Sequence, residues 1–138
     1  MILWYRKTRR ALYVAPFVGT ISSPHLEPFP GEGEVISKSY LVLRNPMDWL
    51  LSFHQGTMPY IPFQLWYRAA GIHPQSALLP SPSWVIRAEH FEKDMMTHLG
   101  IEAHIALCSP SPRNSLCPAV AAQIRRSNAK DYSLGGYE

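Results

Sequence analysis

The stretch Lys38-Ser-Tyr-Leu-Val-Leu-Arg-Asn-Pro-Met-Asp-Trp-Leu-Leu-Ser-Phe53 decides the fold class of this chain. Its first six residues are rich in strand formers and predict a β-strand. Pro46 then stands at a favourable first-turn position of a helix, and Asn45 is the expected N-cap. From Pro46 to Gln55 apolar side chains recur at helical intervals, and Gly56 is expected to end the helix. The stretch therefore predicts a strand that leads directly into a helix.

Further strands and helices are expected to alternate along the chain. Strands are predicted at Ala11–Ala15 and Trp84–Arg87, and helices at 63–70, 89–99 and from Pro118 to about Lys130. Residues 17–37 contain many glycines and prolines and predict a long loop with at most one turn of helix. This alternation predicts an α/β fold in which helices flank a small, mostly parallel sheet. The 138 residues suit one core, so we expect a single domain over 1–138.

The composition favours a globular protein without a membrane span. Hydrophobic residues make up 46% and charged residues 17%, which excludes general disorder. The 13 prolines disfavour an all-helical bundle. No apolar run reaches the roughly 18 residues that a membrane-spanning helix needs. Because the first ten residues place apolar side chains before basic ones, the reverse of a secretory signal, we expect a cytoplasmic protein.

Charge and cysteine content narrow the range of partners. The formal net charge of +3 depends on four basic residues between Arg6 and Arg10, and the rest of the chain is close to neutral, so we expect no nucleic-acid binding. Cys108 and Cys117 lie in a Ser/Pro loop, where free thiols are the default expectation and one disulfide is the alternative in an oxidising compartment. The six histidines show no metal-ligand spacing, so no metal site is expected.

The predicted junction of strand and helix is the most informative place for function. Backbone N–H groups at a helix N-terminus favour an anion, and Arg44 beside them can pair with it. Ser52 lies eight residues after Arg44, about two helical turns on, and can reach the same anion if the ligand lies along the helix. The ordinary alternative is that Arg44 is a surface side chain or pairs with a carboxylate.

The segment Leu41–Phe53 resembles the part of the sulfotransferase superfamily that binds the 3′-phosphate of 3′-phosphoadenosine-5′-phosphosulfate. The family has a strand, then Arg-(Asn/Asp)-Pro, then a helix with Ser eight positions after the Arg, which correspond here to Arg44, Pro46 and Ser52. Four further segments resemble family segments in the family's order: His73-Pro-Gln75, Ser83–Asp94, His98–Ile101 and Ile124–Glu138. The resemblance covers 38–138 and implies a P-loop-like sulfotransferase core of the prokaryotic or carbohydrate type.

The resemblance is weaker at the loop that would hold the 5′-phosphosulfate. The family loop is Pro-Lys-Thr/Ser-Gly-Gly/Ser/Thr-Thr, and the corresponding stretch here is Pro16-Phe-Val-Gly-Thr-Ile-Ser22. The resemblance thus implies that Gly19 and Thr20 bind the donor together with Arg44 and Ser52. Phe17 stands where the family has a lysine that stabilises charge on the bridging oxygen. The alternative source of that charge is a basic residue of 6–10 folding over the site.

The family's chemistry also requires a general base near the phosphosulfate, and His25 and Glu27 are the candidates after the loop. If active, the chain would transfer a sulfuryl group to a hydroxyl or amine acceptor by in-line displacement without a metal. The first alternative is a non-catalytic descendant of the fold, which serves as an interaction or assembly component with protein partners, for example in a virus or mobile element. The second is a binding domain unrelated to sulfotransferases.

Two groups of residues outside the candidate site are expected to be structural. Arg87 and Glu89 match a conspicuous family pair, and we expect them to orient one another and to cap the helix that follows. The aromatic residues Trp66, Tyr67 and Trp84 are expected in the core.

Overall fold

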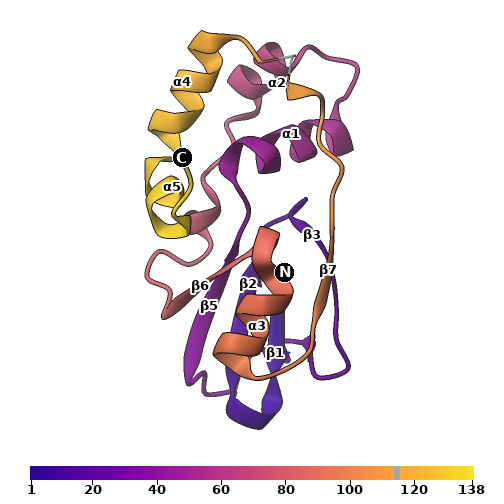
Figure 1. Ribbon diagram of the computed structural model, residues 1–138, viewed down its shortest axis with the longest axis vertical. Helices are drawn as coiled ribbons and strands as arrows, with labels where there is room; N and C mark the ends of the chain where they lie inside the picture. Colours follow the sequence, from indigo (N-terminus) through magenta and orange to yellow (C-terminus); the bar gives the residue numbers. More distant parts are fainter. Residues whose placement is uncertain (114–115) are drawn as a thin grey trace.

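The computed structural model describes residues 1–113 and 116–138. Its main sheet has five strands in the order β4-β1-β2-β5-β6, and a two-stranded ribbon pairs β3 with β7 (Figure 1). The strands of the sheet are β1 (Ile2–Tyr5), β2 (Arg10–Val14), β4 (Glu27–Pro28), β5 (Lys38–Leu43) and β6 (Trp84–Arg87). The ribbon consists of β3 (Gly19–Ser22) and β7 (His104–Leu107). The chain therefore has a mixed α/β architecture, in agreement with the α/β fold class that the sequence predicts.

The main sheet is parallel on one side and antiparallel on the other. β5 pairs in parallel with β2 and β6, whereas β1 runs antiparallel to β2 and β4. The prediction of a mostly parallel sheet is thus correct for β2, β5 and β6 and wrong for the remainder. The sequence pattern predicts no strand at Ile2–Tyr5, since four apolar residues before a basic segment do not indicate a hairpin by themselves. This strand forms through its antiparallel pairing with β2, which the local sequence pattern does not predict.

β5 lies inside the sheet, between β2 and β6, because its residues can be buried on both faces. Leu41, Val42 and Leu43 are completely buried, and such continuous apolar runs are typical of internal parallel strands. The register sets Val14 of β2 beside Val42, and Val42 beside Ile86 of β6. The carboxyl ends of the three parallel strands therefore lie together.

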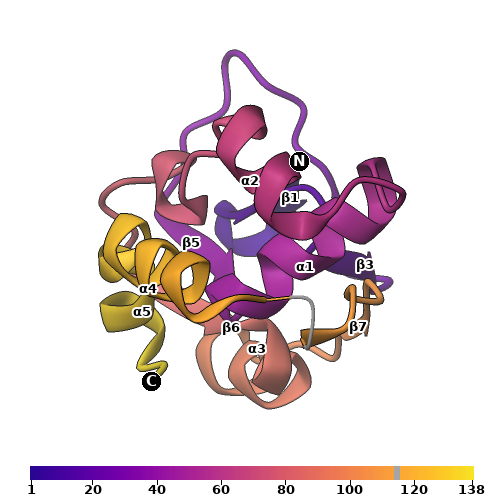
Figure 2. The same cartoon turned by 90° about the horizontal axis from the view of Figure 1, so that it is seen from above.

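Helices surround the sheet, with α1 lying across the carboxyl ends of the parallel strands (Figures 1 and 2). The α-helices of the described residues are α1 (Pro46–Thr57), α2 (Phe63–Ala70), α3 (Phe91–Leu99), α4 (Pro118–Ser127) and α5 (Ala129–Gly135). Short 3-10 turns are η1 (Arg6–Thr8), η2 (Gln75–Ala77) and η3 (Ala88–His90). Within the described part of the chain, no helix combines the length and the apolar character that crossing a membrane requires.

The predicted boundaries at Asn45, Gly71 and Gly100 are confirmed, whereas the predicted end of α1 at Gly56 is wrong, since the helix continues to Thr57 with Met58 as its C-cap. The Asn45 side chain accepts a hydrogen bond from the Met47 backbone N–H at 3.0 Å, and Gly71 and Gly100 end α2 and α3 in the left-handed conformation. The single helix predicted from Pro118 is wrong, because the chain breaks at Asn128 into α4 and α5. The Asn128 side-chain amide donates to the Ile124 carbonyl at 2.9 Å, which competes with continuation of the helix.

The hydrophobic core lies between the sheet and the helices. Its buried members include Leu12, Val14, Tyr40, Val42, Trp49, Leu50, Ile86, Phe91, Met95, Val120 and Ile124. Trp66 and Tyr67 join this core as predicted. Trp84 does not, since it is 51% exposed on the edge strand β6 and stacks on the His98 ring. β6 has a neighbouring strand, β5, along one side only, which leaves Trp84 exposed. The sequence pattern does not reveal which strand is at the edge.

The prediction of one long loop over 17–37 is wrong in two places. Residues 19–22 form β3, which pairs antiparallel with β7, and Glu27–Pro28 form β4 at the sheet edge. Both strands are short and find partners far away in the sequence. Local patterns therefore do not identify them.

Candidate anion-binding site

Arg44 lies directly after β5 and is only 5% exposed. Its Nη1 donates to Ser52 Oγ at 2.7 Å and to the Cys108 carbonyl oxygen at 2.8 Å. Ser52 Oγ donates to the same carbonyl oxygen at 3.0 Å. The spacing of eight residues thus brings Arg44 and Ser52 together as the sequence predicts, and their two donor groups converge on one oxygen atom.

The guanidinium of Arg44 is a buried charge without a close counter-ion. Of the described carboxylates, none lies within 4.0 Å of it, and the ion pairs of the chain involve other residues. The alternative of a surface arginine or a carboxylate-paired one is therefore wrong for Arg44. Because a guanidinium stays protonated in proteins, its burial is costly unless dipoles or an anion compensate it. This electrostatic situation favours an anion at the site.

A clamp of hydrogen bonds fixes the backbone of Arg44. Gln75 Oε1 accepts from the Arg44 N–H at 3.1 Å, and Gln75 Nε2 donates to the Arg44 carbonyl at 2.8 Å. The completely buried Asp131 in turn accepts from the backbone N–H groups of Gln75 and Ser76, at 2.8 and 3.3 Å. The Pro-Gln turn thus has a positioning role. Sequence reasoning missed the role of Asp131, since nothing local connects it with Gln75.

Glu89 holds the N-terminus of α1. Its Oε2 accepts from the Asn45 N–H at 2.8 Å, and its Oε1 accepts from the Tyr137 hydroxyl at 2.6 Å. Burial, together with this hydrogen bond to Glu89, raises the pKa of Tyr137 well above its usual range. Arg87 pairs with Asp94 instead, with Nε and Oδ2 3.5 Å apart. The prediction that Arg87 and Glu89 orient one another and cap the following helix is therefore wrong.

The loop after β2 forms a tight turn followed by a strand. Phe17 has a φ of 64°, and its ring packs on Phe53 at 4.7 Å between centroids and fills the space above Gly56. Gly19 and Thr20 lie in β3, with Leu107 and Ala106 of β7 as register partners. Their backbone is thus part of a β-ladder. No helix begins here, although a helix is what a phosphate-cradling loop normally leads into.

The ribbon brings this loop close to the buried arginine. Val18, next to Gly19, accepts a hydrogen bond through its carbonyl from the Cys108 N–H at 3.4 Å. The Cys108 carbonyl is the group that Arg44 and Ser52 contact. Gly19 therefore lies near the candidate site, because its neighbour Val18 is hydrogen-bonded to Cys108, whose carbonyl oxygen Arg44 and Ser52 contact.

His25 and Glu27 lie at the other end of the sheet. The Glu27 carboxylate pairs with Arg6 Nε at 2.9 Å, and the His25 ring stands edge-on to Tyr5 at 6.5 Å. Tyr5 is the register partner of Arg10, which is at the amino end of the parallel strand β2. Arg44 follows the carboxyl end of β5, about 20 Å away along a six-residue strand. The structure does not bring the two candidate bases to Arg44 and Ser52.

The basic residues 6–10 lie at that same distant end. Arg10 Nη1 donates to the His98 carbonyl at 2.6 Å, and Arg6 is engaged by Glu27. These side chains therefore do not fold over the loop in place of the missing lysine.

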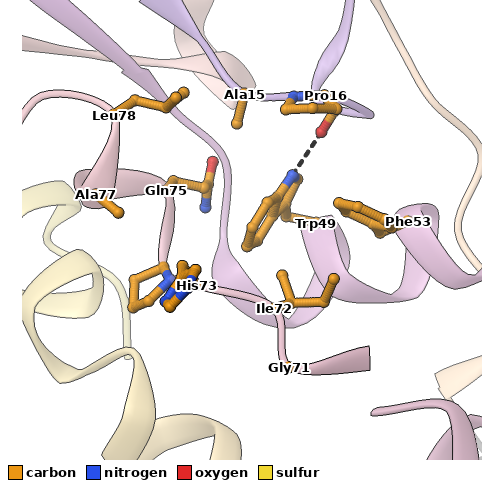
Figure 3. A pocket seen from close by; sticks show the side chains of 11 residues that line it. Ala15, Pro16, Trp49, Phe53, Gly71, Ile72, His73, Gln75, Ala77 and Leu78 are labelled. Atoms are coloured by element: carbon orange, nitrogen blue, oxygen red, sulfur yellow. Dashed lines mark hydrogen bonds between the residues drawn. The ribbon is translucent and has the colours of Figure 1, made fainter. Parts of the chain in front are cut away.

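A pocket of about 350 Å³ lies beyond the carboxyl end of β2 (Figure 3). Its walls are mainly apolar and come from Pro16, from Trp49 and Phe53 of α1, and from the segment 71–78. The Trp49 indole donates to the Pro16 carbonyl at 2.7 Å, and the Gln75 amide stands at the pocket wall. The crevice outside the carboxyl ends of parallel strands is where open α/β sheets bind ligands.

Metal-ligand chemistry has no support at these positions. Among the described residues, no three His, Cys, Asp or Glu side chains are grouped to hold a metal ion. Cys108 and Cys117 are free thiols, which confirms the default expectation and excludes the disulfide between them in this structure.

The comparisons with known proteins add no relatives. No family model matches this chain, no curated protein matches it, and no solved structure matches it. The sulfotransferase resemblance therefore stays a prediction that depends on the residues alone.

Proposed function

We propose that this chain binds a nucleotide of the 3′-phosphoadenosine-5′-phosphosulfate type, with its 3′-phosphate at Arg44 and Ser52, and that it does not transfer the sulfuryl group. The observation that carries the proposal is the convergence of Arg44 Nη1 and Ser52 Oγ on one oxygen atom beside a buried guanidinium. A phosphate oxygen in the place of the Cys108 carbonyl would accept both hydrogen bonds. It would also supply the negative charge that the described surroundings of Arg44 lack.

We propose no sulfuryl transfer because the residues at the loop do not fit the phosphosulfate. Phe17 offers no charge, and the backbone of Gly19 and Thr20 is committed to the pairing with β7. His25 and Glu27 lie too far away to take an acceptor proton beside Arg44. Losing one preorganised donor alone commonly costs about 3–4 kcal/mol of transition-state stabilisation. These features favour the non-catalytic descendant of the sulfotransferase fold.

The direct test is titration calorimetry with adenosine 3′,5′-bisphosphate. We expect Arg44→Ala to weaken binding by about 1.5–3 kcal/mol, roughly tenfold to a hundredfold, because a charge-assisted contact is lost. Ser52→Ala should cost less, since it removes one neutral hydroxyl. Arg126→Ala is the matched control, because it removes an equal charge from an exposed position of α4. Adenosine 5′-monophosphate, which lacks the 3′-phosphate, should bind the wild type as weakly as the bisphosphate binds Arg44→Ala.

A second readout separates binding from folding. Arg44 is buried, so Arg44→Ala also changes the packing, and each variant must be shown to be folded at the titration temperature. The melting temperature of the wild type should rise with ligand concentration. Equal affinities of the wild type and a folded Arg44→Ala variant would contradict the site, as would the absence of heat and of any thermal shift at millimolar ligand.

An assembly role is the second candidate, and exposed apolar side chains around α2 favour it. Tyr60 is 95% exposed, Leu65 59% and Met58 50%. Met58 and Leu65 surround an apolar hollow of about 420 Å³ together with Ile61, Trp66, Ala69 and Ala70. If this surface pairs with a second copy of the chain, sedimentation velocity should show concentration-dependent association that Leu65→Ser abolishes. A monomer at all concentrations would exclude self-association through it.

A further inference from the structure

We propose that Ser111 and His54 form a nucleophile and general-base pair that accepts acyl groups from small carboxylic esters. The pocket at this pair shares no lining residue with the pocket beside Pro16, and the inference is independent of nucleotide binding at Arg44. His54 Nδ1 lies 2.7 Å from Ser111 Oγ, and His54 Nε2 lies 2.6 Å from the Ile61 carbonyl oxygen. Both side chains are at least 95% buried.

The chemistry of the Ile61 carbonyl fixes the protonation of the imidazole. A carbonyl oxygen can only accept a hydrogen bond, so the neutral ring carries its proton on Nε2 and has its lone pair on Nδ1. Ser111 Oγ must then donate its proton to Nδ1. A serine that donates to a histidine whose other nitrogen is held by a third group is the arrangement that activates a serine nucleophile.

The imidazole ring is held rigidly in this orientation. Phe63 and Trp66 contact it with centroid distances of 5.4 Å each, Phe63 edge-on at 83° and Trp66 at 57°. The main chain at Ser111 is fixed separately by a hydrogen bond from its N–H to the Leu51 carbonyl at 3.1 Å. The segment is thus tied to α1 by a hydrogen bond that does not involve the hydroxyl.

The Gln55 side chain also lies beside the nucleophile. Its Oε1 accepts a hydrogen bond from Ser111 Oγ at 3.2 Å, a longer contact than the 2.7 Å between Ser111 Oγ and His54 Nδ1. The hydroxyl proton thus has His54 Nδ1 as its nearer acceptor and Gln55 Oε1 as its second. A half-turn of the amide would exchange Oε1 for the NH₂ group and place a donor next to the position where a carbonyl oxygen of a bound ester becomes negative.

A pocket of about 290 Å³ gives access to the pair, and this size sets the substrate class. His54, Gln55 and Ser111 line it together with the segment 59–63 and Pro112. Its prolines and Tyr60 offer apolar walls for a short acyl chain. In the reaction, Ser111 Oγ attacks the ester carbonyl carbon while its proton moves to His54 Nδ1. The carbon–oxygen bond to the alcohol breaks, the alcohol takes the proton from His54, and water then hydrolyses the acyl-serine by the same route.

The test uses 4-nitrophenyl acetate with the full chain. We expect one acetyl group per chain on the peptide that contains Ser111, detected by mass spectrometry, and release of 4-nitrophenolate at least ten times faster than with Ser111→Ala. Ser109→Ala, at an exposed position two residues earlier, is the matched control and should keep the wild-type rate. Equal rates for the wild type and Ser111→Ala, or acetylation only at lysines or the N-terminus, would overturn the proposal.

A second variant tests the pair without relying on ester turnover. In Ser111→Cys the introduced thiol should be ionised by His54 and should react with iodoacetamide at pH 7 at least ten times faster than Cys108 and Cys117, which serve as internal references. The additional substitution His54→Gln should bring the introduced thiol down to the reference rate. A folded Ser111→Cys variant whose thiol reacts no faster than the references would contradict a base at His54.

Discussion

Phe17 determines what the turn after β2 can do. Its φ of 64° is a left-handed conformation that costs a non-glycine residue about 1–2 kcal/mol. The contact of its ring with Phe53 offsets this cost and ties the turn to α1. Gly56 is required below it, because a Cβ at that position would clash with the Phe17 ring. The residue in the place of the family's lysine therefore has a packing role.

Restoring a lysine at this position should not restore chemistry. We expect Phe17→Lys to lower the free energy of unfolding by about 1–3 kcal/mol, because the ring contact with Phe53 is lost. It should produce no turnover of the phosphosulfate donor, since the ammonium would extend to solvent. Phe17→Leu is the control that keeps an apolar side chain without the charge. Urea denaturation and a donor-turnover assay on the same proteins decide the matter, and a stable Phe17→Lys variant with clear turnover would favour the enzyme.

The α5 helix secures the site through η2, and this contact between elements is open to direct measurement. We expect Asp131→Ala to cost about 2–4 kcal/mol of stability, because it leaves the buried N–H groups of Gln75 and Ser76 without an acceptor. Asp48→Ala, which breaks a more exposed ion pair with Arg113, should cost less than about 1 kcal/mol. Urea denaturation that gives the two variants equal stabilities would contradict the clamp.

The hydrogen bonds of the Tyr137 hydroxyl to Glu89 and to the Leu43 carbonyl predict a loss of stability in alkali. The pKa of Tyr137 is raised in the folded state, so unfolding releases its proton more readily as the pH rises above the unfolded value near 10. Stability contributed by the neutral hydroxyl is therefore complete below that pH and is lost above it. Melting temperatures between pH 9 and 11 should fall more steeply for the wild type than for Tyr137→Phe. Parallel curves would show that this hydroxyl is not responsible.

The elements that could be predicted are those whose signals are local. β5 and α1 follow from the apolar run, from Asn45 and from Pro46, and each of these acts within a few residues. The ribbon of β3 and β7 depends instead on a long-range contact. Its tight packing even requires Gly19, since a Cβ there would lie 2.6 Å from the Ala106 carbonyl oxygen. No nearby residue reveals that requirement.

At the scale of the whole molecule, the candidate site shows the same difference between local signals and long-range contacts. Arg44 and Ser52 meet because one strand and one helix fix their spacing, so their juxtaposition could be predicted. The placement of His25 and Glu27 depends on β4 joining the antiparallel side of the sheet, next to β1. The chain thereby carries them to the amino end of the parallel strands. Sequence proximity to the loop gave no indication of this path.

The molecule thus divides its polar groups between two ends of the sheet. The basic hairpin of β1 and β2, with Glu27 and His25, occupies one end. Arg44, Ser52, Gln75 and their clamp occupy the other, where α1 begins. The anion binding that we propose uses the carboxyl end of the parallel strands, so the proposed function depends on that end alone.

A crystal structure of the chain with adenosine 3′,5′-bisphosphate tests this account most directly. We predict that an oxygen of the 3′-phosphate replaces the Cys108 carbonyl and lies at about 2.7–2.9 Å from Arg44 Nη1, within hydrogen-bond distance of Ser52 Oγ. The Cys108 main chain should have moved away to admit it. A nucleotide bound elsewhere, with the Cys108 carbonyl still accepting from both Arg44 and Ser52, would contradict the assignment of the anion site.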